Sequence, residues 1–319
     1  MRRRAAIYGT FLNRALDQVL MDLALHRLGA TLVVDRAGVT GDDGPSHNGL
    51  WDLALLQPVP GLRIAAPRDL PTLREELREA IGVSDAPTAV RFPRGGAGAD
   101  IPALRRIGGV DMLRESHDGV LVVAVGAMAR AALEASRQCA RHGVETTVAD
   151  PRWVKPLPAE LLRLAARHSA VVTVEDGLRT GGVGTALVQA LHDAGIRARV
   201  RVLGVADGFP EQGTRAEILA EAGLTAEAIA EAVIAAAGAG KPPGPHGRVS
   251  QTGVGTLPVR SASVRKLARK VPGVTPRFRT NALRNDSAEP KPVRRAITAI
   301  GSSPVSSTAC AASRRTCST

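Results

Sequence analysis

The sequence predicts an α/β fold with two αβ domains, each built on a mostly parallel sheet, followed by a disordered basic tail. Short apolar runs, typical of buried parallel strands, alternate with helical patterns of 3.6-residue period. The length of 319 residues matches two domains of roughly 150 residues each. After residue 237 the composition shifts to Pro, Gly, Ser, Thr and Arg with little periodicity, which favours disorder over 238–319.

The first predicted domain covers residues 1–96 and opens with a short strand at 5–8. A helix is predicted from Thr10, because apolar residues recur there about every 3.6 positions and share one face. Those residues are Leu12, Leu16, Val19, Leu20 and Leu23. Pro71 suits the first turn of a later helix, where proline is tolerated. The remaining expected elements are a strand at 31–34, a helix at 48–56, a strand at 62–66, a helix at 69–81 and a strand at 88–92.

The second predicted domain covers residues 118–237 and follows a linker at 97–117 that is rich in glycine at its start. Thr214 and Thr225 are suited to cap the N-termini of its last two helices. Strands that alternate with helices predict βαβ units and mostly parallel sheets. The strands are expected at 120–125, 145–149, 170–174 and 198–203, and the helices at 128–142, 158–167, 185–192, 214–222 and 225–237.

The formal net charge of +12 is confined to the tail. Residues 241–319 contain 15 Lys and Arg against two acids, Asp286 and Glu289, so residues 1–240 keep 27 basic and 28 acidic side chains. Fifteen positive charges could give nonspecific affinity for nucleic acid. The tail has one aromatic residue, Phe278, and no recognisable binding module, so nucleic acid is not an expected partner.

The cysteines and the first residues of the chain indicate the cellular compartment. Cys139, Cys310 and Cys317 form no disulfide framework and no paired metal-ligand spacing. Cys139 falls in a helical pattern, where a buried inert thiol is expected. No apolar run reaches the length of a membrane span. The basic residues 1–4 are followed by polar residues where a signal peptide needs an apolar core, so a cytoplasmic location and no membrane contact are expected.

A glycine-rich loop follows the strand at 31–34 and holds Asp42, Asp43 and His47. Polar groups just past the carboxyl end of a parallel strand lie where open α/β sheets bind ligands. A histidine titrates near neutrality and can transfer protons, and a nearby carboxylate can orient it. The alternative is an ordinary solvated turn, since Asp, Gly, Pro and Ser are turn residues. No metal site is predicted, because the loop has a single histidine.

Two arginines follow strand-like runs and should share one edge of the sheet. Arg36 and Arg94 could there grip a phosphate or a carboxylate with paired hydrogen bonds. A surface salt bridge is the alternative.

Tyr8 and Phe11 are two of only seven aromatic residues and lie three positions apart. They indicate a flat apolar wall suited to a ring-bearing cofactor, and the alternative is packing at the start of a helix. The turn at 181–184, Gly-Gly-Val-Gly, could hold an anion at a helix N-terminus. It lacks the dinucleotide fingerprint and a P-loop lysine, so a structural turn is favoured there.

Several of these segments together resemble a known family, 1-deoxy-D-xylulose-5-phosphate synthase. Four segments carry the resemblance, in order and at family-like spacing: residues 7–19 (IYGTFLNRALDQV), 35–38 (DRAG), 43–49 (DGPSHNG) and 90–95 (VRFPRG). It continues through 150–157 (DPRWVKPL), 174–177 (VEDG) and 212–214 (QGT). The segment 43–47 alone is unspecific, because transketolases carry a similar run. The resemblance covers about residues 5–237.

The resemblance implies a thiamine diphosphate enzyme that condenses pyruvate with D-glyceraldehyde 3-phosphate and releases CO2, to make a precursor of isoprenoids, thiamine and pyridoxal. It implies a partial pyrimidine-binding domain followed by a transketolase C-terminal-like domain, and a homodimer. By position, Phe11 would stack on the aminopyrimidine ring and Tyr8 would shape its pocket. Arg36 and Arg94 would bind the acceptor phosphate. Asp43 and His47 would bind substrate as the catalytic pair, with His47 the candidate for proton transfer.

The chain also departs from the family pattern. The family's Gly-Asp-Gly motif, which binds Mg2+ and the diphosphate, is absent, so the Mg2+ ligands are expected on a missing N-terminal domain. No acidic residue precedes Asp17 to serve as the family's cofactor-activating glutamate, and Gly9 replaces its usual serine. We therefore expect the chain to be inactive by itself, either as a gene remnant or as half of a split enzyme that a separate diphosphate-binding chain completes.

Two other functions stay open at this point. One is a transketolase or a dehydrogenase β-type subunit of a split thiamine diphosphate enzyme, in which a separate pyrimidine-binding domain is normal. The segments at 35–38 and 93–95 argue against it. The other is a noncatalytic remnant whose basic tail binds anions.

Overall fold

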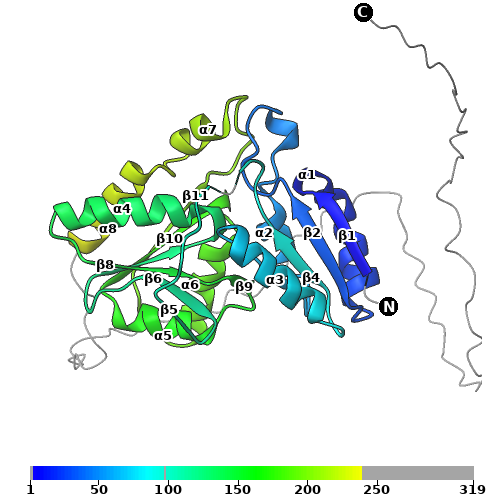
Figure 1. Cartoon of the computed structure of the whole chain (residues 1–319), viewed down its shortest axis with the longest axis horizontal. Coiled ribbons are helices and arrows are strands. Elements are labelled where there is room, and N and C mark those ends of the chain that lie inside the picture. Colours follow the sequence, from blue (N-terminus) through cyan, green and yellow to red (C-terminus); the bar gives the residue numbers. More distant parts are fainter. Residues whose placement is uncertain (1–2, 97, 239–319) are drawn as a thin grey trace, which may run out of the picture. The chain divides into compact units, whose positions relative to one another are not determined.

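A computed structural model describes residues 3–96 and 98–238, which form two sheets with helices packed on them (Figure 1). The first sheet contains β1 (Arg3–Tyr8), β2 (Ala30–Asp35), β3 (Arg63–Ala65), β4 (Thr88–Arg91) and β9 (Trp153–Lys155). The second contains β5 (Arg105–Ile107), β6 (Val110–Arg114), β7 (Val120–Ala124), β8 (Thr146–Asp150), β10 (Ala170–Leu178) and β11 (Val200–Val205). The predicted disordered tail lies outside the described residues.

The helical segments connect these strands, as the alternation of patterns predicts. The α-helices are α1 (Gly9–Leu12), α2 (Asp52–Leu56), α3 (Leu70–Gly82), α4 (Ala129–Arg141), α5 (Ala159–Arg167), α6 (Val183–Asp193), α7 (Arg215–Glu221) and α8 (Ala226–Gly238). Shorter or irregular turns are η1 (Asn13–Ala15), η2 (Gln18–Ala24), η3 (Pro45–His47) and η4 (Gly126–Met128). None of the helices in the described part of the chain is both long and apolar enough to cross a bilayer.

The first sheet has the strand order β1-β2-β4-β3-β9, and its first four strands run parallel. Val34 of β2 pairs with Arg91 of β4. Because these neighbouring strands end at the same edge, the segments that follow them, with Arg36 and Arg94, emerge side by side. The prediction of mostly parallel sheets is confirmed, and this edge carries the candidate site.

The last strand of the first sheet comes from the second predicted domain. β9 pairs antiparallel with β3, with Ile64 opposite Lys155, and Lys155 Nζ donates to the carbonyl of Leu56 at 3.2 Å. No strand is predicted at 153–155, because three residues give no alternating pattern. The two halves are thus interlocked through one sheet.

The second sheet has the order β11-β10-β7-β8-β6-β5 and is covered on both faces. Along β7, Val120 and Val122 pack in the apolar cluster with α4 and α8, whereas Leu121 and Val123 pack in the cluster with α5 and α6. Burial on both faces explains why this strand is a continuous apolar run. Cys139 of α4 is a buried free thiol, as predicted.

The predicted linker at 97–117 is wrong in its second half. Residues 105–114 form the hairpin β5–β6, which adds to the edge of the second sheet through β8. Its turn is Gly108-Gly109, with φ of 53° and 88°. Two consecutive residues of positive φ are the usual connection of a tight hairpin. Val110 and Met112 are buried, so the glycines mark a turn between strands.

The predicted helix from Thr10 is correct in place but not regular. It is divided into α1, η1 and η2, and Leu25 N–H donates to the carbonyl of Leu20, five residues back. This wider turn rotates the buried face, so that Ala24 is buried while Leu20 is exposed. The predicted helix at 48–56 is also shorter, because residues 48–51 belong to the loop closure described below.

The helix predicted at 69–81 is confirmed as α3. Asp69 caps it: the Asp69 carboxylate accepts from Thr72 N at 2.9 Å, and the Thr72 hydroxyl accepts from Asp69 N at 3.1 Å. Pro71 lies in the first turn, where its missing N–H costs no hydrogen bond.

Candidate functional site at the carboxyl edge of the first sheet

A closed loop, residues 36–49, follows β2 and holds most of the predicted site. Gly38 and Gly49 exchange backbone hydrogen bonds of 2.8 and 2.9 Å, which close the loop at its neck. Arg36 has a φ of 56°, uncommon for a non-glycine residue and typical of functional sites. Only glycine fits at position 49, where the two backbone segments of the neck lie close together, because a Cβ there would lie 2.4 Å from the Arg36 carbonyl oxygen.

Inside the loop, two buried polar side chains form hydrogen bonds to the backbone. Asn48 Oδ1 accepts from Thr40 N at 2.8 Å, and the Thr40 hydroxyl donates to the carbonyl of His47 at 2.9 Å. Both side chains are buried, so these bonds are costly to break. These hydrogen bonds fix the conformation of the backbone segment that carries Asp43 and His47.

The structure brings Arg36, Arg94 and Asp43 together. Asp43 Oδ2 lies 3.2 Å from Arg36 Nη1 and 2.9 Å from Arg94 Nη1. The three side chains are between 31% and 42% exposed, so solvent and ligands can reach them. Two guanidinium groups share one carboxylate, which leaves a net positive charge. This arrangement suits a phosphate or a carboxylate ligand.

The two predicted aromatic residues lie beside this cluster. The Tyr8 and Phe11 rings stack with centroids 6.1 Å apart, and the Arg36 guanidinium lies 4.3 Å from the centre of the Tyr8 ring. The His47 ring meets Phe11 edge-on at 6.4 Å. Tyr8 and Phe11 are 41% and 43% exposed. They present an open aromatic surface, so the core-packing alternative does not describe them.

His47 stands at the rim of the loop. Its Nδ1 lies 2.9 Å from Ser46 Oγ, so a serine hydroxyl that donates to Nδ1 leaves the ring proton on Nε2. The Ser46 backbone is tied to α1, since the Thr10 hydroxyl donates to its carbonyl at 2.9 Å. Asp42 is exposed and contributes only its backbone carbonyl, which accepts from Gln212 Nε2 at 3.2 Å.

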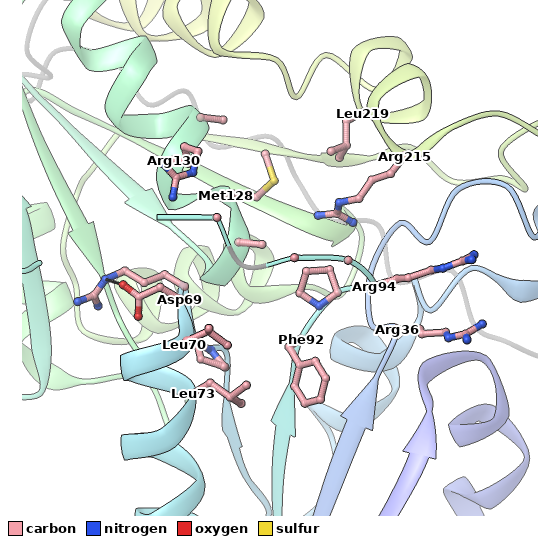
Figure 2. Close-up of a pocket in the computed structure, with 18 of the residues that line it drawn as sticks. Arg36, Asp69, Leu70, Leu73, Phe92, Arg94, Met128, Arg130, Arg215 and Leu219 are labelled. Atoms are coloured by element: carbon pink, nitrogen blue, oxygen red, sulfur yellow. Dashed lines mark ion pairs between the residues drawn. The ribbon is translucent and has the colours of Figure 1, made fainter. Parts of the chain in front are cut away.

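A pocket of about 790 Å³ opens next to the paired arginines (Figure 2). Figure 2 shows Arg36, Arg94 and Arg215 on one side of it and Leu70 and Leu73 of α3 on the other. Met128 and Leu219 contribute from the second predicted domain. The site therefore lies where both halves of the described chain meet.

Beneath the loop, sequence reasoning missed a buried group of charges. Arg91 Nε donates to Asp52 Oδ2 at 2.7 Å, and Arg91 Nη1 donates to Asp176 Oδ1 at 2.9 Å. Burial disfavours the ionised form of Asp176, yet Arg91 and Arg215 outweigh it and lower the pKa. The sequence signal that could have indicated these ion pairs is a charged residue at the end of an apolar run, as in 88–91 and 170–176.

The turn at 181–184 binds a carboxyl group that the chain itself provides. Glu175 accepts from the N–H groups of Val183 and Gly184, both at 2.9 Å, at the start of α6. A Cβ on Gly182 would lie 2.3 Å from the same carboxylate. The turn is structural, as favoured from its sequence.

The described residues fit one part of a thiamine diphosphate molecule. The partly exposed, stacked rings of Tyr8 and Phe11 suit an aminopyrimidine ring. Among residues 3–96 and 98–238, no group of three His, Cys, Asp or Glu side chains could hold a metal ion. The residues described here thus offer a surface for the ring and no ligand set for a metal-bound diphosphate.

Comparison with known protein families follows the same division of the chain. The family model for the transketolase pyrimidine-binding domain matches residues 2–98, and the model for the transketolase C-terminal domain matches residues 108–229.

Curated relatives share more than half of the aligned residues. The chain is 56% identical over 255 residues to 1-deoxy-D-xylulose-5-phosphate synthase 1 of Kitasatospora griseola, covering 79% of the chain and 38% of the relative. It is 57% identical over 232 residues to the 1-deoxy-D-xylulose-5-phosphate synthase of Leifsonia xyli, covering 72% of the chain and 36% of the relative. The chain therefore spans a little over a third of the length of these relatives.

Solved structures with the same fold include a split-gene transketolase described as an inactive β4 tetramer. Its TM-score is 0.66 at 28% identity, over 74% of this chain and 76% of that one. A transketolase from Pichia stipitis matches with a TM-score of 0.57 at 17% identity, over 74% of this chain and 34% of that one. The second likeness concerns the fold alone.

Proposed function

The chain belongs to the thiamine diphosphate-dependent transketolase family and corresponds to a C-terminal portion of 1-deoxy-D-xylulose-5-phosphate synthase; on this premise we propose that it forms the pyrimidine-binding side and the acceptor site of such a synthase. The complete enzyme would condense pyruvate with D-glyceraldehyde 3-phosphate to 1-deoxy-D-xylulose 5-phosphate and CO2. The product would supply isoprenoid, thiamine and pyridoxal synthesis. The observation that carries the proposal is the convergence of Arg36 and Arg94 on Asp43 beside the Tyr8–Phe11 surface.

Arg36 and Arg94 bind the acceptor phosphate in this proposal. Their guanidinium groups emerge from neighbouring strands and already hold one anionic oxygen, Asp43 Oδ2, between them. A phosphate oxygen can take the same place, because guanidinium groups bind phosphate and carboxylate in similar geometry. Asp43 then turns to the acceptor's single hydroxyl group, on C2, which donates a hydrogen bond to it.

His47 donates a proton to the acceptor in this proposal. When the new carbon–carbon bond forms, the acceptor's carbonyl oxygen gains negative charge and must be protonated. With Ser46 donating to Nδ1, the proton on His47 Nε2 is available for that transfer. The imidazole faces Phe11, which places it beside the surface assigned to the cofactor.

Phe11 and Tyr8 hold the aminopyrimidine ring of thiamine diphosphate. Bound thiamine diphosphate supplies the electron sink for decarboxylation of pyruvate. The 319 residues contain no Gly-Asp-Gly motif. We place the Mg2+ and diphosphate ligands on sequence outside these 319 residues, and expect these residues alone to be inactive.

An exposed apolar surface supports association with further protein. β1 is an edge strand whose residues 3–6 are exposed. Met21 of η2 and Leu25, the residue that follows η2, are 47% and 65% exposed. An unpaired strand edge next to exposed apolar side chains is typical of a surface that another chain covers. A homodimer or a diphosphate-binding chain would cover it.

Phosphorus NMR of the isolated chain tests the acceptor site directly. Glycerol 3-phosphate, an unreactive analogue of the acceptor, should bind the wild type, and inorganic phosphate should compete with it. Arg36→Met and Arg94→Met should each weaken binding about tenfold or more, since each removes one charge-assisted contact. Binding that both variants retain would contradict the proposal.

A split transketolase is the second candidate, because the split-gene transketolase covers 74% of this chain at 28% identity. The two functions differ in the donor. A transketolase takes a two-carbon unit from a ketose phosphate without releasing CO2, whereas the synthase takes its unit from pyruvate and releases CO2.

A further inference from the structure

One arginine of the C-terminal half contacts the backbone of the loop that carries the proposed phosphate site. Arg215, the first residue of α7, donates through Nη1 to the carbonyl of Val39 and through Nη2 to Asp176 Oδ2 at 2.7 Å. Val39 lies between Arg36 and Asp43, three and four residues away. Both terminal nitrogens of the guanidinium therefore contact the chain itself.

The loop backbone closely approaches the side chain of Asp176 and the backbone of Arg215. A Cβ on Gly38 would lie 2.5 Å from the Asp176 carboxylate, and one on Gly41 would lie 2.7 Å from the backbone nitrogen of Arg215. Both glycines have positive φ, 72° and 97°. Only glycine combines that conformation with so close an approach. Residues 38–41 are thus packed against the C-terminal half without a gap.

Asp176 is itself held from the other side. It is fully buried, and Arg91 at the end of β4 donates to Asp176 Oδ1 at 2.9 Å, while Asp52 of α2 pairs with Arg91 at 2.7 Å. The ion pairs run without interruption from Asp52 through Arg91 and Asp176 to Arg215. They connect the first sheet to α7, and the loop backbone lies at their end.

We propose that Arg215 and Asp176 are positioning residues that hold residues 38–41, and through them Arg36 and Asp43, in the conformation that binds the acceptor phosphate. This inference rests on the proposed function of the two arginines. It gives the C-terminal half a part in the site: that half supplies the support for the phosphate-binding loop. If the loop were released, it would lose conformational entropy when the ligand binds. The affinity would then fall although no contact to the ligand is removed.

Arg215 is distinguished from a third phosphate ligand by its partners. Nη1 and Nη2 of Arg215 each donate to the chain itself, to Val39 and to Asp176, so two of the five guanidinium N–H groups are committed to the support of the loop. Arg130 also lines the pocket, from α4, and donates to the carbonyl of Ala99 instead of to the loop. Arg130 is therefore the matched control for positive charge in the pocket without support of the loop.

The test compares Arg215→Met, Arg215→Lys and Arg130→Met in the full chain. Hydrogen–deuterium exchange reports on the loop amides at 38–48, and phosphorus NMR reports the affinity for glycerol 3-phosphate. We expect about tenfold faster exchange in the loop and about tenfold weaker binding in Arg215→Met. Arg215→Lys should fall between wild type and Arg215→Met, because one ammonium group cannot reproduce the planar fork. Arg130→Met should match the wild type in both readouts.

The outcomes separate this inference from the proposed function. Unchanged loop exchange in Arg215→Met overturns the positioning role, whatever the affinity does. Weaker binding in Arg130→Met equal to that in Arg215→Met also overturns it, since pocket charge alone would then explain both. If the wild type binds no glycerol 3-phosphate, the phosphate site fails, and the exchange rates still decide whether Arg215 and Asp176 hold the loop. Circular dichroism melts of both Arg215 variants show whether each remains folded.

Discussion

Arg94 Nη1 lies 2.9 Å from Asp43 Oδ2, the same oxygen that Arg36 Nη1 contacts at 3.2 Å. The carboxylate stands where the proposed phosphate would bind, so it competes with any simple anion. Asp43→Asn should therefore raise the affinity for inorganic phosphate several-fold at low ionic strength, and added salt should reduce the gain. Phosphorus NMR titration measures both. Asp42→Asn removes the same charge one residue away and should change the affinity less. Equal gains in both variants would show that Asp43 has no special place between the arginines.

The short helix α1 carries an exposed and a buried apolar side chain next to each other, so a role in ligand binding can be tested separately from a role in folding. Phe11 is 43% exposed, whereas the next residue, Leu12, is 1% exposed in the core of the first sheet. Leu12→Ala should lower the free energy of unfolding by about 3 kcal/mol, and Phe11→Ala by no more than about 0.5 kcal/mol. Urea unfolding of the two variants checks this. A large loss of stability in Phe11→Ala would assign that ring to the core and remove it from the proposed cofactor surface.

The loop neck depends on the absence of a side chain at position 49. A Cβ on Gly49 would lie 2.4 Å from the Arg36 carbonyl oxygen and 3.0 Å from Ala37 Cα, both backbone atoms. Gly49→Ala should therefore cost about 2–3 kcal/mol of stability and weaken glycerol 3-phosphate binding by moving Arg36. Gly82→Ala is the control, because nothing lies within 4 Å of its Cβ. If Gly49→Ala matched Gly82→Ala in chemical denaturation and in binding, the tight neck would not be required.

Stability should fall with rising pH because of Glu175. Burial raises its pKa from 4.5 to about 7, although the N–H groups of Gly184 and Val183 favour the charged form. A carboxyl with a raised pKa binds its proton more tightly in the folded state, so the free energy of unfolding falls between pH 4.5 and about 7. At about 1.4 kcal/mol per pH unit, this group contributes a loss of about 3 kcal/mol.

Glu175→Gln, which resembles the protonated acid, should remove that part of the pH dependence. The measurement is urea unfolding of wild type and variant across pH 4.5 to 8. The difference between the two curves isolates Glu175 from other carboxyls, such as Asp150, whose pKa burial raises to about 6. Parallel curves would mean that Glu175 is ionised throughout.

Local patterns predicted the fold well where a segment is buried on both faces. The runs at 31–34 and 88–92 were recognisable as parallel strands, and this alone predicted that Arg36 and Arg94 share an edge. By contrast, β9 has three residues, and its partner β3 lies about ninety positions earlier. The linker prediction failed because the glycines at 108 and 109 form a hairpin turn, which composition alone does not distinguish from a flexible segment.

The structure brings together the side chains proposed for the site, whereas the contacts beneath them were not predicted. Tyr8, Phe11, Arg36, Asp43, His47 and Arg94 were all identified from local context, and the structure places them around one loop. The ion pairs beneath them were not, because Arg91 reaches Asp52 and Asp176 across 39 and 85 residues. Such pairings depend on how the two sheets pack against each other, and no periodic pattern in the sequence predicts that packing.

Product analysis of a chimera tests the central claim most directly. Residues 1–238 of this chain would replace the matching segment of the Kitasatospora griseola synthase, with which it shares 56% identity. With pyruvate, D-glyceraldehyde 3-phosphate, thiamine diphosphate and Mg2+, the chimera should form 1-deoxy-D-xylulose 5-phosphate and an equal amount of CO2. Arg36→Met in the chimera should lower kcat/KM for the phosphorylated acceptor. A folded chimera that releases no CO2 from pyruvate but transfers a two-carbon unit from a ketose phosphate would contradict the claim.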